Sequence, residues 1–227
     1  MHRIVLTIIG LVVVLVHISA QDDPQYRMEI GAGVGMVSYE GDFNGNVLKN
    51  MQPMASLLWR YNFDPYKDLR LSASYGKLKG SSADVKTYYP DYAESTYEFN
   101  HNVVDVSLVF EYNFWPYGTG RDYRGAKRLT PYIYGGLGAT SVSGGSKSVF
   151  TANVPIGIGV KYKVRERLNV GLDWGFHFSL NDELDGVKDP YRVKSSGAFK
   201  NTDCYSMLQL TIAYSFKAKC RTCNKEE

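Results

Sequence analysis

The side chains best suited to chemistry stand late in the chain, in the segment His177-Phe178-Ser179. Residues two apart on a strand point the same way, so an imidazole base and a hydroxyl nucleophile would meet there. Asp182 or Glu183 could supply the carboxylate that orients the imidazole. The segment therefore holds the parts of a serine hydrolase, with a buried hydrogen-bond network around the histidine as the structural alternative.

The spacing of His177 and Ser179 resembles the H-x-S element of the outer-membrane lipid A deacylases. The asparagine expected after the serine is Leu180 here, and Glu183 lies nearer than in that family. Strand alternation also turns both side chains away from the face that would meet a lipid substrate. We therefore expect no catalytic residues, and a hydrogen-bonding role for His177.

Metal chemistry has little support in the sequence. The chain has four histidines, and none belongs to a cluster with the spacing of metal ligands. The acidic stretch from Asp182 to Gly186 lacks the alternating acidic positions of a calcium loop. We expect neither a metal nor a cofactor.

A second reactive group is the pair Cys220 and Cys223, in the terminal sequence CRTCNKEE. Cys204 lies sixteen residues before Cys220, which along a strand separates them by more than about 50 Å, far beyond the ~7 Å that a disulfide allows. In an oxidising compartment the tail pair would form a local disulfide or an intermolecular one. A redox role would need a thioredoxin-like domain, and a zinc site would need further ligands; the sequence offers neither.

The first twenty residues indicate the compartment. MHR is basic, Ile4 to Val16 is an apolar run of 13 residues, and Ala20 precedes a plausible cleavage point. A membrane anchor would need about 20 apolar residues. We expect a signal peptide over residues 1–20, cleaved near Ala20, and no lipid anchor, because no cysteine follows the cleavage point.

The mature composition favours exported β-structure. Export removes one arginine, so the net charge becomes 25 minus 23, or +2, which gives no reason to expect a nucleic-acid partner. The chain holds 18 tyrosines and 22 glycines and no later apolar run long enough for a membrane helix. These features point to strands rather than helices.

Strand periodicity is clearest from Leu168 to Leu180, where apolar residues alternate strictly with small or polar ones over thirteen residues. The same alternation recurs in 152–164 and 208–216. Strands of globular proteins usually run to about 5 or 6 residues, whereas a tilted transmembrane strand needs about 9 to 11. The long runs therefore favour a membrane barrel over a soluble sandwich.

Eight such runs can be counted, an even number as a closed single-chain barrel requires. We therefore predict an all-β fold, an eight-stranded antiparallel transmembrane β-barrel over residues 21–216, in the outer membrane of a Gram-negative bacterium. Both termini, including the tail 217–227, are expected in the periplasm. The expected strands are Tyr26 to Tyr39, Met51 to Phe63, Asp68 to Lys79, Asn102 to Phe114, Thr130 to Val142, Phe150 to Val164, Arg167 to Leu180 and Cys204 to Phe216.

The polar face of these strands carries charges of both signs. Eight strands enclose an interior that side chains alone can fill, so these charges would pair rather than line a channel. The sequence thus predicts no porin function. The expected lumenal charge network consists of Glu29, Arg60, Arg70, Asp105, Glu111, Lys161, Lys163, Asp173 and His177.

One connection on the expected periplasmic side is long, from Trp115 to Leu129, and carries four cations. A solvated basic loop is the simpler interpretation. A partner-docking element, formed with the tail cysteines Cys220 and Cys223, is the alternative. The cations are Arg121, Arg124, Lys127 and Arg128.

Several segments together resemble the PorG-type outer-membrane proteins of the type IX secretion system. They are EIGAGVGMVSYEGDFN, TPYIYGGLGA, VPIGIGVKYKV and LNDELDGV, and the YEGDFN corner and the DELDGV loop carry most of the likeness. The resemblance implies a non-enzymatic barrel that anchors a periplasmic ring of PorK lipoprotein and PorN. The alternatives are a lipid A acyl hydrolase using His177 and Ser179, and a structural or surface-binding barrel.

Overall fold

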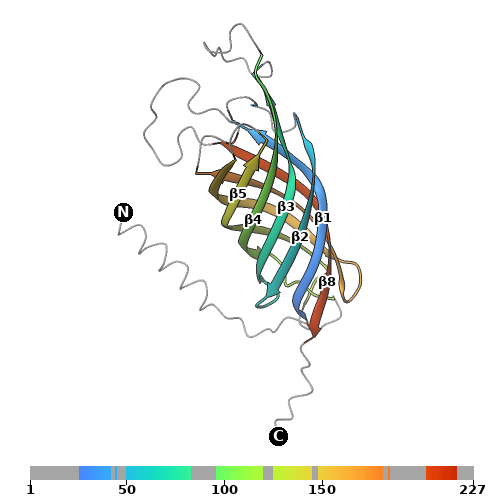
Figure 1. Cartoon of the computed structure of the whole chain (residues 1–227). Helices are drawn as coiled ribbons and strands as arrows, with labels where there is room; N and C mark the ends of the chain where they lie inside the picture. Colours follow the sequence, from blue (N-terminus) through green and yellow to red (C-terminus); the bar gives the residue numbers. More distant parts are fainter. Residues whose placement is uncertain are drawn as a thin grey trace, which may run out of the picture.

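The computed structural model describes residues 26–41, 44, 50–82, 96–119, 125–144, 148–180, 184 and 203–218. They form a closed antiparallel barrel in which each strand pairs with its neighbours in the chain and β8 pairs with β1 (Figure 1). The predicted fold is thereby confirmed. The strands are β1 (Tyr26–Glu40), β2 (Gln52–Asn62), β3 (Lys67–Ser81), β4 (Glu98–Asn113), β5 (Leu129–Ser143), β6 (Val149–Lys163), β7 (Leu168–Ser179) and β8 (Cys204–Ala218).

The outer surface of the barrel is apolar on every strand. Large hydrophobic side chains are exposed all the way round the wall, a band that would be unstable in water because soluble proteins rarely expose so much continuous apolar surface. Among the described residues no helix is long and apolar enough to cross a bilayer. Exposed members from the eight strands include Val34, Leu57, Leu71, Val106, Leu137, Ile158, Leu172 and Ile212.

The inner surface has the opposite character over much of its length. Glu29 and Asp105 are each 1% exposed and Glu111 is 0% exposed, although all three carry a carboxyl group. Charges inside and hydrocarbon outside invert the arrangement of a soluble protein. This arrangement is the one that a membrane-spanning barrel requires.

The two ends of the barrel differ in their connections. At one end, which we call the terminal end, β1 begins beside the end of β8. Two connections there, 63–66 and 164–167, are tight four-residue turns closed by backbone hydrogen bonds. The third connection there, 114–128, is longer. At the opposite end, the loop end, strands are joined through 41–51, 82–97, 144–148 and 180–203.

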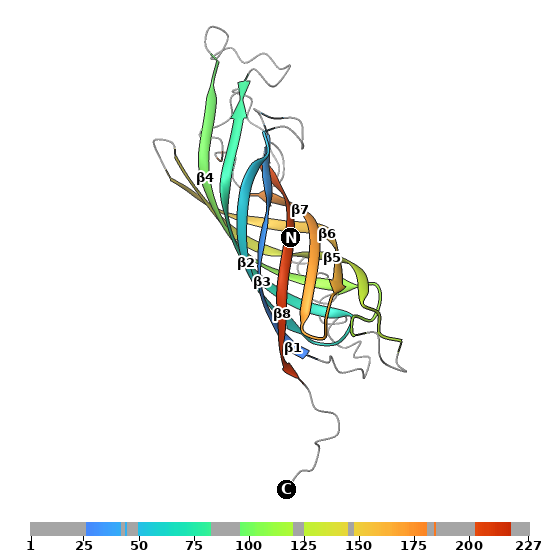
Figure 2. The ribbon, with the colours of Figure 1, turned by 90° about the vertical axis from the view of Figure 1, so that its right-hand side faces the viewer.

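The β3–β4 hairpin extends beyond its expected limits at the loop end (Figure 2). The expected strands ended at Lys79 and began again at Asn102, but β3 continues to Ser81 and β4 begins at Glu98. The reason is packing, because Phe99 is 4% exposed and its ring meets that of Tyr39 edge-on, with centroids 5.1 Å apart. The other strand ends lie within two residues of those expected.

Two buried tyrosines explain the glycines on the inner face of β6 and β7. A Cβ at Gly159 would lie 2.5 Å from Cζ of Tyr132, and one at Gly157 or Gly175 would overlap the ring or hydroxyl of Tyr134. The tyrosine rings therefore occupy the space that side chains at these positions would fill. The glycines are needed for this reason rather than for their backbone freedom.

Some predictions fall outside the described residues. The signal peptide, Arg121, Arg124, Cys220 and Cys223 belong to this group. Cys204 is described and opens β8 at the loop end, as expected, with Sγ 3.8 Å from Oε2 of Glu40. It is a free thiol.

Adding one methyl group at Gly175 should destabilise the barrel by about 1 to 3 kcal/mol, the usual cost of overpacking. The methyl group would overlap the hydroxyl of Tyr134. The check is urea unfolding of Gly175→Ala in lipid vesicles, followed by tryptophan fluorescence. In a Tyr134→Phe background the cost should fall, because the overlapping oxygen is gone; an unchanged cost would contradict this account of the glycine.

Candidate functional site

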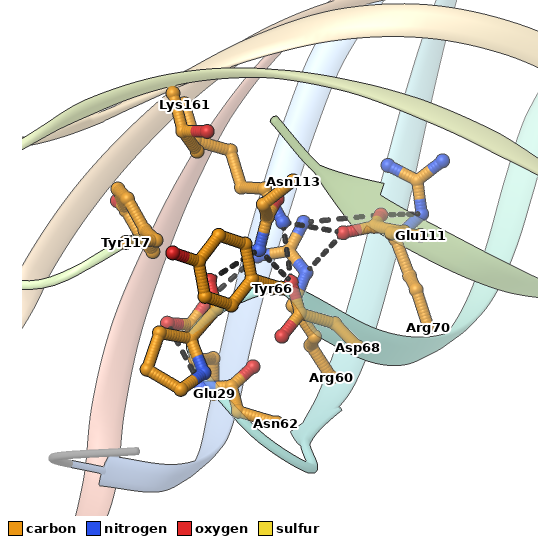
Figure 3. A network of polar contacts seen from close by, with 12 residues as sticks. Glu29, Arg60, Asn62, Tyr66, Asp68, Arg70, Glu111, Asn113, Tyr117 and Lys161 are labelled. Carbon is orange, nitrogen blue, oxygen red and sulfur yellow. Dashed lines mark hydrogen bonds and ion pairs between the residues drawn. The ribbon is translucent and has the colours of Figure 1, made fainter. Parts of the chain in front are cut away.

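Glu111 lies at the centre of an ionic cluster in the half of the lumen nearest the terminal end (Figure 3). Its carboxylate accepts hydrogen bonds from Nε of Arg60 at 2.9 Å and from Nζ of Lys161 at 2.7 Å. Nε of Arg70 lies 3.0 Å from its other oxygen, Oε1. All four side chains are buried, so three cations share one carboxylate with little screening by water.

Further carboxylates balance these cations. Arg60 also pairs with Glu29 at 2.5 Å, and Lys161 pairs with Asp68 at 2.6 Å. Arg70 reaches Asp173 at 3.4 Å. The cluster thus has four acids and four bases, and four minus four leaves no net charge. Its members are Glu29, Asp68, Glu111, Asp173, Arg60, Arg70, Lys161 and Lys163.

Asparagine and serine side chains satisfy much of the remaining hydrogen-bonding capacity of the cluster. Nδ2 of Asn113 donates to Asp68 at 2.9 Å, and Nδ2 of Asn62 donates to Glu29 at 3.4 Å. Oγ of Ser215 donates to Oε1 of Glu29 at 3.1 Å, and Asn169 links Glu29 to Ser215. A buried ionic group is stable only when its hydrogen bonds are made, and this shell supplies them.

Tyr117, from the connection 114–128, covers the terminal end of the lumen. Its hydroxyl donates to Oδ1 of Asn169 at 3.0 Å, and its ring faces the Lys163 ammonium, 4.9 Å from the centroid. Burial, together with the nearby Glu29 carboxylate, raises the pKa of the Tyr117 phenol and keeps it a donor. The Lys163 ammonium donates to Oδ1 of Asn169 at 2.7 Å.

The backbone of this connection is folded against the barrel rather than held away from it. Tyr117 and Lys127 form an isolated parallel β-bridge. The N–H of Tyr117 donates to the carbonyl of Pro65, in the neighbouring turn, at 3.0 Å. Lys127 lies over the exposed Trp115 ring at 4.5 Å, and Nε of Arg128 donates to the Thr119 carbonyl at 2.8 Å. Lys127 and Arg128 remain exposed.

Asp105 organises a second polar cluster at mid-barrel. Its Oδ2 accepts from the Tyr205 hydroxyl at 2.8 Å and from Nδ2 of Asn153 at 2.6 Å. The His177 ring stacks on Tyr205 with centroids 4.8 Å apart, and its Nδ1 lies 3.5 Å from Asp105. Thr140 completes the cluster through the Tyr205 hydroxyl at 2.7 Å.

The candidate hydrolase pair therefore lies inside the barrel. His177 is 5% exposed and Ser179 is 0% exposed, so a lipid in the bilayer cannot reach either. Oγ of Ser179 donates to Oγ1 of Thr151 at 3.4 Å. The His177 imidazole lies beside Asp105 and stacks on the Tyr205 ring. Among the described residues no group of His, Cys, Asp or Glu could hold a metal ion.

The lumen near the loop end is apolar, which the sequence analysis did not foresee. Leu184, from the β7–β8 connection, is 0% exposed and belongs to a cluster of buried hydrophobic side chains there. Its N–H donates to Oδ2 of Asp203 at 2.9 Å, its carbonyl meets Nδ1 of His101 at 3.2 Å, and the Tyr39 hydroxyl donates to Asp203 at 2.5 Å. The cluster comprises Val37, Tyr39, Met54, Leu78, Phe99, Val103, Val142, Leu184, Tyr205 and Met207.

The structure places all nine residues of the expected lumenal network inside the barrel, in two separate clusters rather than one. Sequence reasoning missed Asp68, although it lies two residues before Arg70 and so shares its face. It also missed Tyr117 and Leu184. Both belong to connections, which have no strand periodicity to reveal an inward residue.

Comparisons with known proteins give a family and a set of similar barrels. A family model described as a domain of unknown function (DUF6089) matches residues 3–225. A comparison with curated protein sequences found no match. The chain is similar to Neisserial surface protein A (NspA), at 13% identity and a TM-score of 0.48, over 83% of this chain and 97% of that one.

Two further solved structures show the same kind of likeness. The outer membrane protein OprG from Pseudomonas aeruginosa matches at 12% identity and a TM-score of 0.48, over 88% of this chain and 100% of that one. The outer membrane enzyme PagL matches at 15% identity and a TM-score of 0.41, over 83% and 99%.

Neutralising Glu111 should destabilise the barrel by about 3 to 5 kcal/mol, because Arg60, Arg70 and Lys161 would then share too few acids. The measurement is the free energy of unfolding of Glu111→Gln in lipid vesicles. A second change, Lys161→Met, should recover part of the loss by restoring the balance of charge. A loss no larger than that of Glu98→Gln, an exposed carboxylate at the loop end, would refute the central role of Glu111.

Proposed function

The chain belongs to the DUF6089 family, and from that premise we propose that it is a non-conducting, non-enzymatic outer-membrane barrel that anchors a periplasmic protein assembly. The observation that carries the proposal is the filled lumen. Ionic groups, Tyr117 and an apolar cluster containing Leu184 occupy it from one end to the other. A barrel with neither a pore nor an accessible catalytic pair would act through the proteins that bind at its ends.

The terminal end is the end we assign to the periplasm. Two of its three connections are tight turns, as expected on the periplasmic side of an outer-membrane barrel, and the loop end carries the two longest connections, 82–97 and 180–203. In this orientation both termini are periplasmic. A signal peptide cleaved near Ala20 would deliver the chain to this location.

Exposed cations gather at the terminal end from four separate parts of the chain, and we call them the basic rim. Glu166 is the single exposed acid at this end among the described residues. An acidic protein surface complements such a rim and would be guided toward it. The basic rim consists of Arg27, Lys127, Arg128, Arg165, Arg167 and Lys217.

The resemblance to PorG-type proteins gives the assembly a specific form, a ring of PorK lipoprotein and PorN of a type IX secretion system. In this proposal Arg121 and Arg124 extend the basic rim. Cys220 or Cys223 could form an intermolecular disulfide with a ring protein. The hydrolase alternative finds no support in the geometry, because His177 and Ser179 are buried in the lumen.

Reversing the charge of Lys127, Arg165 and Arg167 to Glu should lower recovery of the cross-linked periplasmic partner about tenfold, since the loss of three surface ion pairs amounts to about 1.4 kcal/mol. The measurement is affinity purification from outer membranes after cross-linking. The matched control reverses Lys77 and Lys79, exposed cations at the loop end. Equal losses in both variants, or none in either, would remove the basic rim from the proposal.

A covalent link through the tail should appear as a higher band on a non-reducing gel of outer membranes. That band should collapse on reduction and vanish in either Cys220→Ser or Cys223→Ser. Mass spectrometry of the band would identify the partner. A single monomer band under all conditions would exclude an intermolecular disulfide and leave attachment to the basic rim.

A further inference from the structure

The membrane-facing wall across β4 to β7 is hollowed by a groove of about 1200 Å³. Its floor contains Gly135, a position on the outer face of β5 where the neighbouring outward residues are Ile133 and Leu137. The missing side chain lowers the wall at this point. Phe110 pairs with Gly135 from β4 and Ile156 from β6, so both flank the depression.

Strand register shows the direction of the groove. Two adjacent rows of outward residues cross the strands, and both line it. The first row starts at Lys67, beside the β2–β3 turn, and the second lies two residues farther from the terminal end on each strand. The first row is Lys67, Tyr112, Ile133, Ile158 and Trp174, and the second is Phe110, Gly135, Ile156 and Phe176.

The first row climbs from the end of the barrel toward the middle of the membrane. Lys67 is the first residue of β3, Ile133 is the fifth of β5 and Trp174 is the seventh of β7. A climb of six residues is about 20 Å along a strand, which a tilt of about 45° reduces to about 14 Å of depth. This depth is close to half of the ~30 Å hydrocarbon core, or one leaflet.

The chemistry of the groove changes along its length. Its deep part is apolar, with aromatic walls formed by Phe110, Trp174 and Phe176. Its shallow end is polar and includes Tyr66 and the ion pair of Lys67 with Asp64, at 3.6 Å. A cation and a tyrosine at the membrane boundary suit the phosphate and glycerol region of a lipid.

We propose that the groove is a binding site for one phospholipid of the leaflet at the terminal end. The acyl chains lie between the two rows, and the phosphate lies beside Lys67 and Tyr66. Only bilayer hydrocarbon or another membrane-embedded surface can reach the deep part. The length of one leaflet and the polar shallow end favour the lipid over a second copy of the chain.

Gly135 offers a clean way to fill the groove. A Cβ at this position would meet only the carbonyl oxygen of Pro155, at 3.8 Å, which is an ordinary contact. A phenylalanine side chain would therefore extend into the groove without disturbing the backbone. Ala32→Phe is the matched control, because Ala32 is exposed on the outer face of β1, outside the groove.

The test is native mass spectrometry of the purified full chain after reconstitution with phosphatidylethanolamine and phosphatidylglycerol. The wild-type barrel and Ala32→Phe should each retain one phospholipid. The lipid-bound fraction of Gly135→Phe should be at least tenfold lower. Lys67→Gln should lower retention while the groove stays open. Heat-modifiable mobility on gels confirms that each variant is folded.

Three results would overturn the proposal. One is equal phospholipid retention by Gly135→Phe and the wild type. Another is retention of lipid A in preference to phospholipid when both are supplied, which would assign the groove to the other leaflet. The last is a dimer without bound lipid that Gly135→Phe dissociates, which would make a second copy of the chain the occupant.

Discussion

The interior of this barrel depends on the carboxylate of Glu111. Eight strands enclose too little space for bulk water, so a charge placed inside must be neutralised by another side chain. Arg60, Arg70 and Lys161 all meet this one carboxylate, and Glu29, Asp68 and Asp173 complete the balance. Six strands contribute to the ion pairs, so the cluster joins distant parts of the sheet across the lumen.

The character of the lumen changes along its axis, and this change bears on function. The terminal half is ionic, the middle holds the Asp105 cluster, and the loop end is apolar around Leu184. Tyr117 and Leu184 come from connections at opposite ends, yet both side chains enter the lumen. The interior is therefore a structural core, and the surfaces left for function are the basic rim, the loop end and the outer wall.

Much of this architecture could be predicted because the two faces of each strand meet different surroundings. Alternation placed Glu29, Asp173 and His177 inward correctly, since a polar residue between apolar neighbours marks the lumenal face. The rule is silent where both faces are apolar, as at Met36 and Val37 or Val103 and Val104, so the apolar part of the lumen was missed.

Other features depend on contacts between segments far apart in the sequence. Phe99 extends β4 because Tyr39 packs against its ring, and no local pattern reveals that partner. The inward glycines of β6 and β7 make room for the rings of Tyr132 and Tyr134, and these partners follow only from the register of the strands. Residues in connections, such as Tyr117, have no periodicity from which to infer their position.

The most direct test of a filled, charge-balanced lumen is the single-channel conductance of the purified barrel in a planar lipid bilayer. A filled lumen should give no current steps for the wild-type chain. The double variant Tyr117→Ala and Leu184→Ala should give none either, because the ionic cluster still fills the space between the two positions. Stable, reproducible steps from the wild-type barrel would show that the lumen is open and that the barrel is a pore.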